Sequence, residues 1–158
     1  MKLTVKSRHR AETEPNTIEE PHIIISISNP GDPIPRPVMN DKTVDAIYFK
    51  FDDIIEMPPQ GSSLWFVLNK DPKLFQMGMA EKIVLKLKET GVQAVMVHCE
   101  MGVSRSAGVA AALAKHFNGD DSEFFLQQPV GLYTGSAGGY YKPNRLVYRL
   151  MLDALQNG

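Results

Sequence analysis

The sequence predicts an α/β fold: one domain, spanning residues 1–158, with a central, mainly parallel sheet that is flanked by helices. Short apolar runs at residues 23–27, 44–51 and 92–97 are typical of buried strands. A long helical pattern separates the last two runs, and a strand, a crossover helix and a strand in this order are typical of a mainly parallel α/β sheet. A chain of 158 residues is also long enough to bury a substantial core without disulfides or metals.

The first half of the chain reads as strands joined by polar loops. Residues 3–5 begin a first strand, and residues 7–21 are polar and rich in turn residues. The isoleucine-rich run at 23–27 is typical of a strand that is covered on both faces. Residues 30–42 contain four prolines, so we expect an ordered or semi-rigid loop there before the strand over 44–51.

The second half begins with a helix over residues 72–90. Lysines form its polar face, aliphatic residues form its apolar face, and Gly91 provides a stop signal. A buried strand over 92–97 follows, and the alanine-rich residues 107–117 have good helix propensity. The segment between this strand and this helix is therefore a strand-to-helix loop, which is where ligands bind in parallel α/β sheets.

Three less specific features complete the chain. A short helical stretch covers residues 122–127, and a glycine-rich loop bordered by tyrosines covers residues 131–139. This loop is equally compatible with a mobile rim beside a functional site and with a plain connection. Asn144 is placed to cap a final amphipathic helix that includes residues 145–152.

The strand-to-helix loop holds the most specific motif in the chain, His98-Cys99-Glu100-Met101-Gly102-Val103-Ser104-Arg105-Ser106-Ala107-Gly108. The first amides of a helix have no partner within it and lie at the positive end of its dipole, so they bind anions. Gly102 permits a backbone turn through which consecutive amides point at a phosphate. The residues predicted to bind phosphate are Glu100, Met101, Gly102, Val103, Ser104, Arg105 and Ser106.

Cys99 is the single cysteine of the chain, and the same electrostatic field favours its thiolate, which is a strong nucleophile. Arg105 supplies a planar fork that holds two phosphoryl oxygens at once. Ser106 either donates a hydrogen bond to the sulfur or satisfies backbone amides at the helix start. His98 either bonds the backbone near Cys99 and orients the loop, or packs as an ordinary buried histidine.

The order of histidine, cysteine, five residues, arginine and serine in residues 98–106 resembles the signature of the cysteine-dependent protein tyrosine phosphatases. Residues 102–106 are similar to the dual-specificity branch of that superfamily. The resemblance extends over residues 22–156 and implies a protein tyrosine phosphatase-like fold, with residues 61–66 as an insertion relative to compact members. It also implies a hydrolase in which Cys99 attacks phosphorus and forms a cysteinyl-phosphate, with no metal or other cofactor.

Members of this family take a general acid, usually an aspartate, from a mobile loop that follows an earlier strand. Residues 51–53 together with Pro58-Pro59 resemble that loop, which implies Asp53 as the acid and Asp52 as the close alternative. A pair of aspartates after a strand is also typical of a solvated turn or a helix cap. Asp71 is a third candidate, although a capping role at the start of the following helix explains it better.

Composition narrows the classes of function. The 17 basic and 18 acidic residues give a net charge of -1, which provides no general attraction to nucleic acid or anionic membranes. The four histidines are scattered without metal-ligand spacing, and no apolar run reaches membrane-spanning length. A single cysteine excludes an internal disulfide and, with an N-terminus that lacks the apolar core of a secretion signal, favours the cytoplasm.

The expected activity is hydrolysis of phosphomonoesters by a protein tyrosine or dual-specificity phosphatase, which acts on a phosphoprotein or another phosphomonoester. Three alternatives are a phosphate-binding module without turnover, an RNA 5′-triphosphate phosphatase, and an arsenate reductase or sulfurtransferase, which also uses a loop cysteine before a helix. A reductase that relays through several cysteines needs more thiols than this chain has. The absence of a basic stripe weighs against an RNA substrate.

Overall fold

The structure, a computed structural model, describes residues 1–126 and 141–158. Its centre is a four-stranded sheet built from β1 (Lys2–Ser7), β2 (His22–Ser28), β3 (Thr43–Lys50) and β4 (Ala94–Cys99). All neighbouring strands are parallel, in the order β1-β4-β2-β3. The predicted α/β fold class is therefore confirmed, whereas the predicted glycine-rich loop at 131–139 lies outside the described residues.

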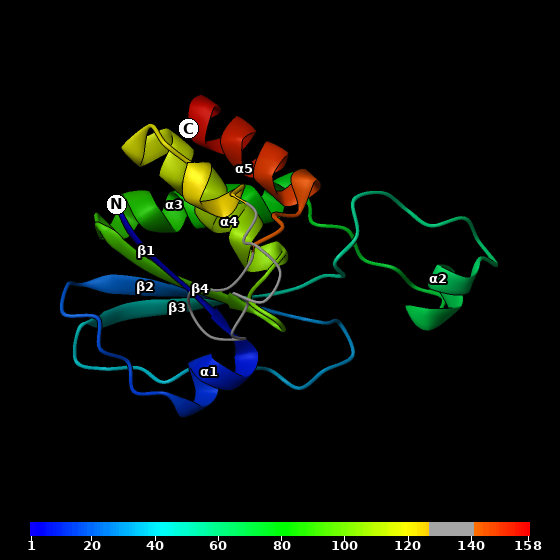
Figure 1. Ribbon diagram of the computed structural model, residues 1–158, viewed down its shortest axis with the longest axis horizontal. Helices are drawn as coiled ribbons and strands as arrows, with labels where there is room; N and C mark the ends of the chain where they lie inside the picture. Colours follow the sequence, from blue (N-terminus) through cyan, green and yellow to red (C-terminus); the bar gives the residue numbers. More distant parts are fainter. Residues whose placement is uncertain (127–140) are drawn as a thin grey trace.

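Helices cover both faces of the sheet (Figure 1). Helices α3, α4 and α5 pack together on one face, and α1 lies on the opposite face. The α-helices are α1 (Arg8–Thr13), α2 (Ser63–Val67), α3 (Met77–Thr90), α4 (Arg105–Leu113) and α5 (Arg145–Asn157). A π-helical turn (Ala114–Asn118) continues α4, and a 3-10 turn (Ser122–Phe124) follows it. Unlike the other helices, α2 stands away from the sheet (Figure 1).

The two central strands hold the sheet in the core. Every isoleucine of β2 lacks exposed surface, and Val95 and Val97 of β4 are buried as completely. Burial of large aliphatic side chains on both faces is what a continuous apolar run predicts. In the register of the sheet, Ser7 of β1 lies opposite Cys99 of β4. The carboxyl ends of the strands therefore meet at one edge, which is where ligands bind in such folds.

The alanine-rich helix α4 packs closely on α5. Every residue from Arg105 to Leu113 is buried, and the small side chains let neighbouring elements approach. A Cβ at Gly108 would lie 2.9 Å from the carbonyl oxygen of Asn144 and 3.0 Å from Cβ of Val147, so there is room only for glycine. This contact places the start of α5 beside the start of α4, at the carboxyl edge of the sheet.

Helix α1 lies within residues 7–21, which the sequence predicts as a polar, turn-rich stretch, so this part of the prediction is wrong. The Ser7 hydroxyl oxygen accepts from the Arg10 amide at 3.2 Å, and Arg10 pairs with Glu14 at 2.7 Å. Ala11 is the buried residue of this helix. A six-residue helix with so little apolar surface leaves no periodic hydrophobic signal in the sequence.

Helix α3 begins at Met77, later than the predicted start at residue 72. The preceding residues 71–76 form neither helix nor strand, and Asp52 holds this segment: the Asp52 amide donates to the Lys73 carbonyl oxygen at 2.8 Å, and the Lys73 amide donates to Asp52 Oδ2 at 2.7 Å. The prediction that Asp71 caps this helix is therefore wrong. Asp71 is instead exposed and pairs with Lys73 at 3.1 Å.

The remaining boundaries follow local signals. Gly91 ends α3 in a left-handed conformation with a φ of 64°, as predicted. Asn144 caps α5, which is also as predicted. Strand β4 continues to Cys99 and α4 begins at Arg105, so the loop between them is shorter than the sequence predicts.

Candidate active site

The loop that joins β4 to α4 lies at the carboxyl edge of the sheet, and we call residues 99–106 the cysteine loop. Cys99 is the last residue of β4, and Arg105 is the first residue of α4. Both are almost completely buried, with 2% and 5% exposure. A strand on one side and a helix on the other therefore fix the two residues for which the sequence predicts direct chemical roles.

Gly102 lets the cysteine loop pack tightly on the end of β1. Its φ of 72° lies in the left-handed region, and a Cβ here would come within 2.7 Å of the Ser7 amide nitrogen and 2.9 Å of the Lys6 carbonyl oxygen. The Arg8 amide also donates to the carbonyl oxygen of Glu100 at 3.1 Å. The loop is thus held from the side of β1, and this packing depends on glycine.

The backbone amides of the cysteine loop are free to bind a ligand. Those of Met101, Gly102, Val103 and Ser104 donate no hydrogen bond to any residue within 1–126 or 141–158. They lie at the N-terminus of α4, where the positive end of the helix dipole adds to their attraction for an anion. The loop therefore has unpaired donors at the position where the sequence predicts a phosphate.

The sulfur of Cys99 has a hydroxyl neighbour, because Ser106 Oγ lies 3.0 Å from Cys99 Sγ, which is the predicted contact. His98 is fully buried. Its Nδ1 donates to the Cys99 carbonyl oxygen at 3.4 Å, and its Nε2 accepts from Ser26 Oγ at 2.7 Å. Burial lowers the pKa of His98, which favours the neutral ring. His98 therefore both packs in the core and orients the strand end that bears the sulfur.

The Arg105 guanidinium is anchored at one corner. Its Nη1 donates to the carbonyl oxygen of Phe51, directly after β3, at 2.8 Å. This bond joins the cysteine loop to the segment that contains Asp53. The other guanidinium donors bond no residue of the described part of the chain, so a bidentate contact with an oxyanion is open to them.

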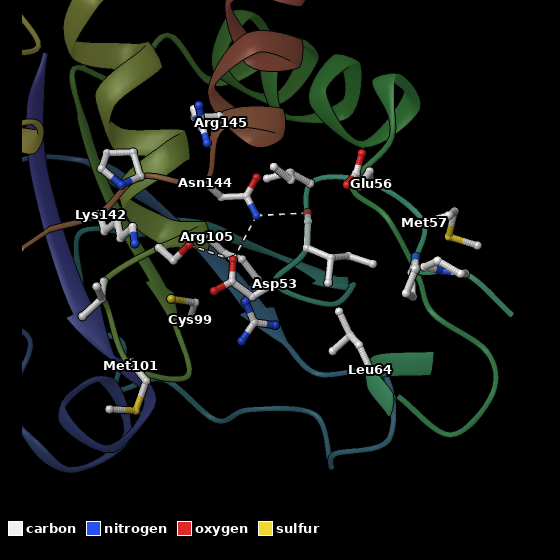
Figure 2. A pocket seen from close by; sticks show the side chains of 17 residues that line it. Asp53, Glu56, Met57, Leu64, Cys99, Met101, Arg105, Lys142, Asn144 and Arg145 are labelled. Atoms are coloured by element: carbon white, nitrogen blue, oxygen red, sulfur yellow. Dashed lines mark hydrogen bonds between the residues drawn. The ribbon is translucent and has the colours of Figure 1, made fainter. Parts of the chain in front are cut away.

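A cleft of about 800 Å³ opens over the cysteine loop (Figure 2). The predicted site residues that line this cleft are Asp53, Cys99, Met101, Val103, Ser104 and Arg105. Glu100, Gly102 and Ser106 were predicted as phosphate-binding residues, but they do not line it. Gly102 and Ser106 act from behind the cleft lining, the first by packing on β1 and the second by contacting the sulfur.

The structure separates the two aspartates that follow β3. Asp52 is buried, and its carboxylate accepts from the Lys73 amide. Asp53 lines the same cleft as Cys99, and its Oδ1 accepts from Ser104 Oγ at 2.7 Å. Asp52 thus holds the chain beside β3, whereas Asp53 is the aspartate that meets the cysteine loop.

Asn144 joins three parts of the site, a role that the sequence does not reveal. Its Nδ2 donates to Asp53 Oδ1 at 2.9 Å and to the Ile54 carbonyl oxygen at 3.1 Å, as Figure 2 shows. Its Oδ1 accepts from the Val147 amide at 3.1 Å, and its own amide donates to the Ser104 carbonyl oxygen at 3.0 Å. The neighbouring residues predict that Asn144 caps a helix. Nothing in the sequence predicts its contact with Asp53, which lies 91 residues away in the chain.

The sequence also does not predict that two cations lie at the cleft. Lys142 and Arg145 line it, and neither forms an ion pair with a residue of the described ranges. The Lys142 amide donates to the Val103 carbonyl oxygen at 2.9 Å, which fixes this segment against the cysteine loop. Figure 2 shows both cations on one side of the cleft and Met57 and Leu64 on the other.

The fold and the site define a small α/β protein with a parallel sheet and one cysteine, which lies at a cleft beside an arginine and an aspartate. No protein-family model and no curated protein matches the chain. Among the residues that the structure describes, no group of three or more His, Cys, Asp or Glu side chains is arranged to hold a metal ion. Within the same residues, no helix combines the length and apolar character needed to cross a membrane. Function is therefore inferred from the geometry of the site.

Proposed function

We propose that the protein is a phosphomonoester hydrolase of the protein tyrosine or dual-specificity phosphatase type, with Cys99 as its nucleophile. The main support is that Cys99, Arg105 and Asp53 line one cleft. The hydrogen bond between Ser104 and Asp53 joins residues 51 positions apart in the chain. If Cys99 were only a core residue that precedes an arginine by chance, the hydrogen bond between Ser104 and Asp53 would have no explanation. The resemblance of residues 98–106 to the phosphatase signature supports the same reaction.

In the first step, the Cys99 thiolate attacks phosphorus in line with the bond to the leaving oxygen. A sulfur–phosphorus bond forms as the phosphorus–oxygen bond breaks, and the Asp53 carboxyl group gives its proton to the departing oxygen. Arg105 and the loop amides hold the equatorial oxygens and stabilise the charge that spreads over them in the transition state. The products are an alcohol or phenol and a cysteinyl-phosphate.

In the second step, water hydrolyses this intermediate. The Asp53 carboxylate takes a proton from the water as its oxygen attacks phosphorus, and the sulfur–phosphorus bond breaks. The Ser106 hydroxyl, 3.0 Å from the sulfur, donates a hydrogen bond to the departing thiolate. Inorganic phosphate leaves, and the enzyme returns to its starting state. This scheme needs no metal ion, because Arg105 and the amides stabilise the charge.

Two hydrogen bonds position Asp53 for both steps. Ser104 Oγ and Asn144 Nδ2 both donate to its Oδ1, at 2.7 and 2.9 Å. Because both donors converge on one oxygen, Oδ2 is the oxygen that exchanges the proton. Ser104 and Asn144 therefore act as positioning residues for the acid.

The direct test is hydrolysis of p-nitrophenyl phosphate by the wild-type protein and by Cys99→Ser. We expect Cys99→Ser to lose essentially all turnover, because a serine hydroxyl is not ionised at neutral pH and is a far weaker nucleophile. More than marginal remaining activity would overturn the proposal. A protein that binds inorganic phosphate and hydrolyses no phosphomonoester would instead be a phosphate-binding module.

A substrate panel distinguishes the remaining possibilities. It contains phosphotyrosyl and phosphoseryl peptides, phosphoinositides and RNA with a 5′-triphosphate. We expect the phosphopeptides to be hydrolysed fastest, since Arg105 is the only cation within the cysteine loop and the other two cations of the cleft, Lys142 and Arg145, come from the segment before α5 and from its start. Preferential release of phosphate from the RNA would favour an RNA 5′-triphosphate phosphatase.

A further inference from the structure

A segment beside the cleft projects from the body of the protein. Residues 55–70, which we call the arm, include α2 and extend away from the sheet (Figure 1). The arm is a formed structure, because Ser62 Oγ accepts from the Trp65 amide at 3.3 Å and caps α2. Asn69 and Lys70 then have left-handed φ values of 57° and 59°, which turn the chain back toward the body. The arm is therefore more than a simple connection.

The arm is rich in exposed apolar side chains. Fourteen large hydrophobic side chains are exposed among the described residues, and five of them lie between Ile55 and Val67. Helix α2 has no buried residue. Single exposed hydrophobic residues are common on any protein surface, whereas contiguous apolar patches mark interaction sites. The arm is thus a candidate interaction surface.

Part of this apolar surface belongs to the cleft. Ile55, Met57 and Leu64 line the cleft, and each is between 45% and 56% exposed. On the other side lie the exposed cations Lys142 and Arg145 (Figure 2). A volume of about 800 Å³ lies in the range that buries most of a drug-sized ligand, so the cleft has room for much more than a phosphate. It presents an apolar side and a cationic side to the group that bears the phosphate, and the exposed Glu56 also lines it.

The arm also offers an unpaired stretch of backbone along the cleft. The amides of Ile55, Glu56 and Met57 donate no hydrogen bond within the described part of the chain, and these residues lie in neither a helix nor a strand. The backbone bends at Ile55 and Glu56, and the main-chain carbonyl oxygens of a polypeptide, which recur at every residue, can accept from these amides. A lipid has no such row of main-chain acceptors. The backbone therefore favours a polypeptide as the occupant.

We propose that the cleft selects phosphopolypeptides in which the phosphorylated residue has an apolar side chain on one flank and an acidic side chain on the other. The apolar side chain contacts Ile55, Met57 and Leu64. The acidic side chain pairs with Lys142 and Arg145. This inference rests on the proposed phosphatase function, to which it adds a class of substrate.

The test compares four synthetic phosphotyrosyl peptides with p-nitrophenyl phosphate. Two peptides have leucine on one flank of the phosphotyrosine and glutamate on the other, in the two possible orders. The third has alanine and the fourth has lysine at both positions. We expect kcat/KM for one leucine–glutamate order to exceed that for the alanine peptide by about 10-fold, since it adds one apolar contact and one partly exposed ion pair.

Two variants with matched controls locate the preference. Leu64→Ser removes an apolar contact, and its control is Val67→Ser, an arm residue that is 74% exposed and does not line the cleft. Arg145→Gln removes a positive charge, and its control is Lys82→Gln, an exposed lysine of α3. We expect each test variant, but neither control, to reduce the preference over the alanine peptide by about 3-fold. Circular dichroism checks that all four variants are folded.

The outcomes separate the two proposals. Equal kcat/KM for all peptides, with p-nitrophenyl phosphate hydrolysed, would overturn the substrate class and leave the phosphatase function standing. If no substrate is hydrolysed, the proposed phosphatase function is wrong. In that case the affinities of fluorescent forms of the four peptides are compared, and equal affinities would overturn the substrate class too. Binding to phosphatidylserine vesicles that Leu64→Ser abolishes, without a peptide preference, would assign the arm to a membrane surface instead.

Discussion

The cysteine loop and the arm border the same cleft but are built in opposite ways. In the cysteine loop, Cys99 and Arg105 are buried and Gly102 has no room for a Cβ. In the arm, apolar side chains lie in solvent, and a Cβ at Gly61 would meet no atom within 4 Å. This difference agrees with the two tasks that we propose for the two regions, catalysis for the cysteine loop and selection of the substrate for the arm. Chemistry requires groups held in position by their surroundings, whereas selection of a substrate requires a surface of the right shape and character.

The contrast between the cysteine loop and the arm predicts that the largest loss of activity comes from a substitution in the cysteine loop, even one that keeps the charge. Arg105→Lys keeps the positive charge but loses the planar fork and the bond to the Phe51 carbonyl oxygen. We expect kcat/KM for p-nitrophenyl phosphate to fall by about 100-fold or more. The arm counterpart is Lys70→Gln, which removes a charge altogether and should have little effect on this substrate. Similar losses from both substitutions would remove the distinction between the two regions.

The next test lies where the two regions join, at the adjacent residues Asp52 and Asp53. Asp53→Ala should lower kcat/KM for unsubstituted phenyl phosphate by about 100-fold, and much less for p-nitrophenyl phosphate, whose leaving group needs no proton. Asp52→Ala should mainly lower the free energy of unfolding, by about 1–3 kcal/mol, because the Lys73 amide loses its acceptor. Selectivity for leaving groups in Asp52→Ala instead would identify Asp52 as the acid.

Two glycines allow a matched comparison of stability. Gly102 and Gly61 have similar φ values of 72° and 84°, so alanine is strained at either position, by about 1–2 kcal/mol. Gly102→Ala adds a clash with the Ser7 amide nitrogen and should cost about 3 kcal/mol or more in urea unfolding, with a clear loss of activity. Gly61→Ala should show only the backbone cost and normal hydrolysis of p-nitrophenyl phosphate. Equal destabilisation by both would mean that the loop is not tightly packed on β1.

The smallest expected effect concerns His98, the residue that precedes Cys99. Burial lowers the pKa of His98 below its ordinary value of about 6.5, so around and below that pH the unfolded chain binds a proton that the folded chain does not. The stability contributed by His98 is therefore complete above about pH 6.5 and decreases as the pH falls toward the folded-state pKa, by at most about 1.4 kcal/mol per pH unit. Urea unfolding of the wild type and of His98→Gln at several pH values measures this contribution. If the free energy of unfolding of both proteins depended on pH in the same way, this prediction would be contradicted.

Much of the fold can be predicted from the sequence, because the central helices and strands are marked by short patterns of neighbouring residues. The isoleucine-rich strand β2, the glycine stop at Gly91 and the cap at Asn144 each depend on a few neighbouring residues. Helix α1 and the start of α3 depend on tertiary contacts instead. In particular, the two hydrogen bonds between Asp52 and Lys73 hold residues outside the helix that the sequence pattern would include in it. Such contacts leave no periodic pattern in the sequence.

The site divides in the same way. Cys99, Arg105 and Ser106 fall within one short motif, so their proximity follows from the chain itself. Asp52 and Asp53 share one local pattern, and only the fold shows which of them lines the cleft. The contact of Asn144 with Asp53 spans 91 residues. A structure is therefore needed to identify the residues that reach the site from distant segments of the chain.

The central claim is that Cys99 becomes phosphorylated during turnover. The most direct measurement is rapid denaturation of the protein in the presence of p-nitrophenyl phosphate, followed by intact-mass analysis and peptide mapping. We predict a fraction of the protein with one added phosphoryl group, located on Cys99. This fraction should be larger in Asp53→Ala, which lacks the base for the second step. Hydrolysis of the substrate with no phosphoryl group on Cys99, in either protein, would contradict the proposed mechanism.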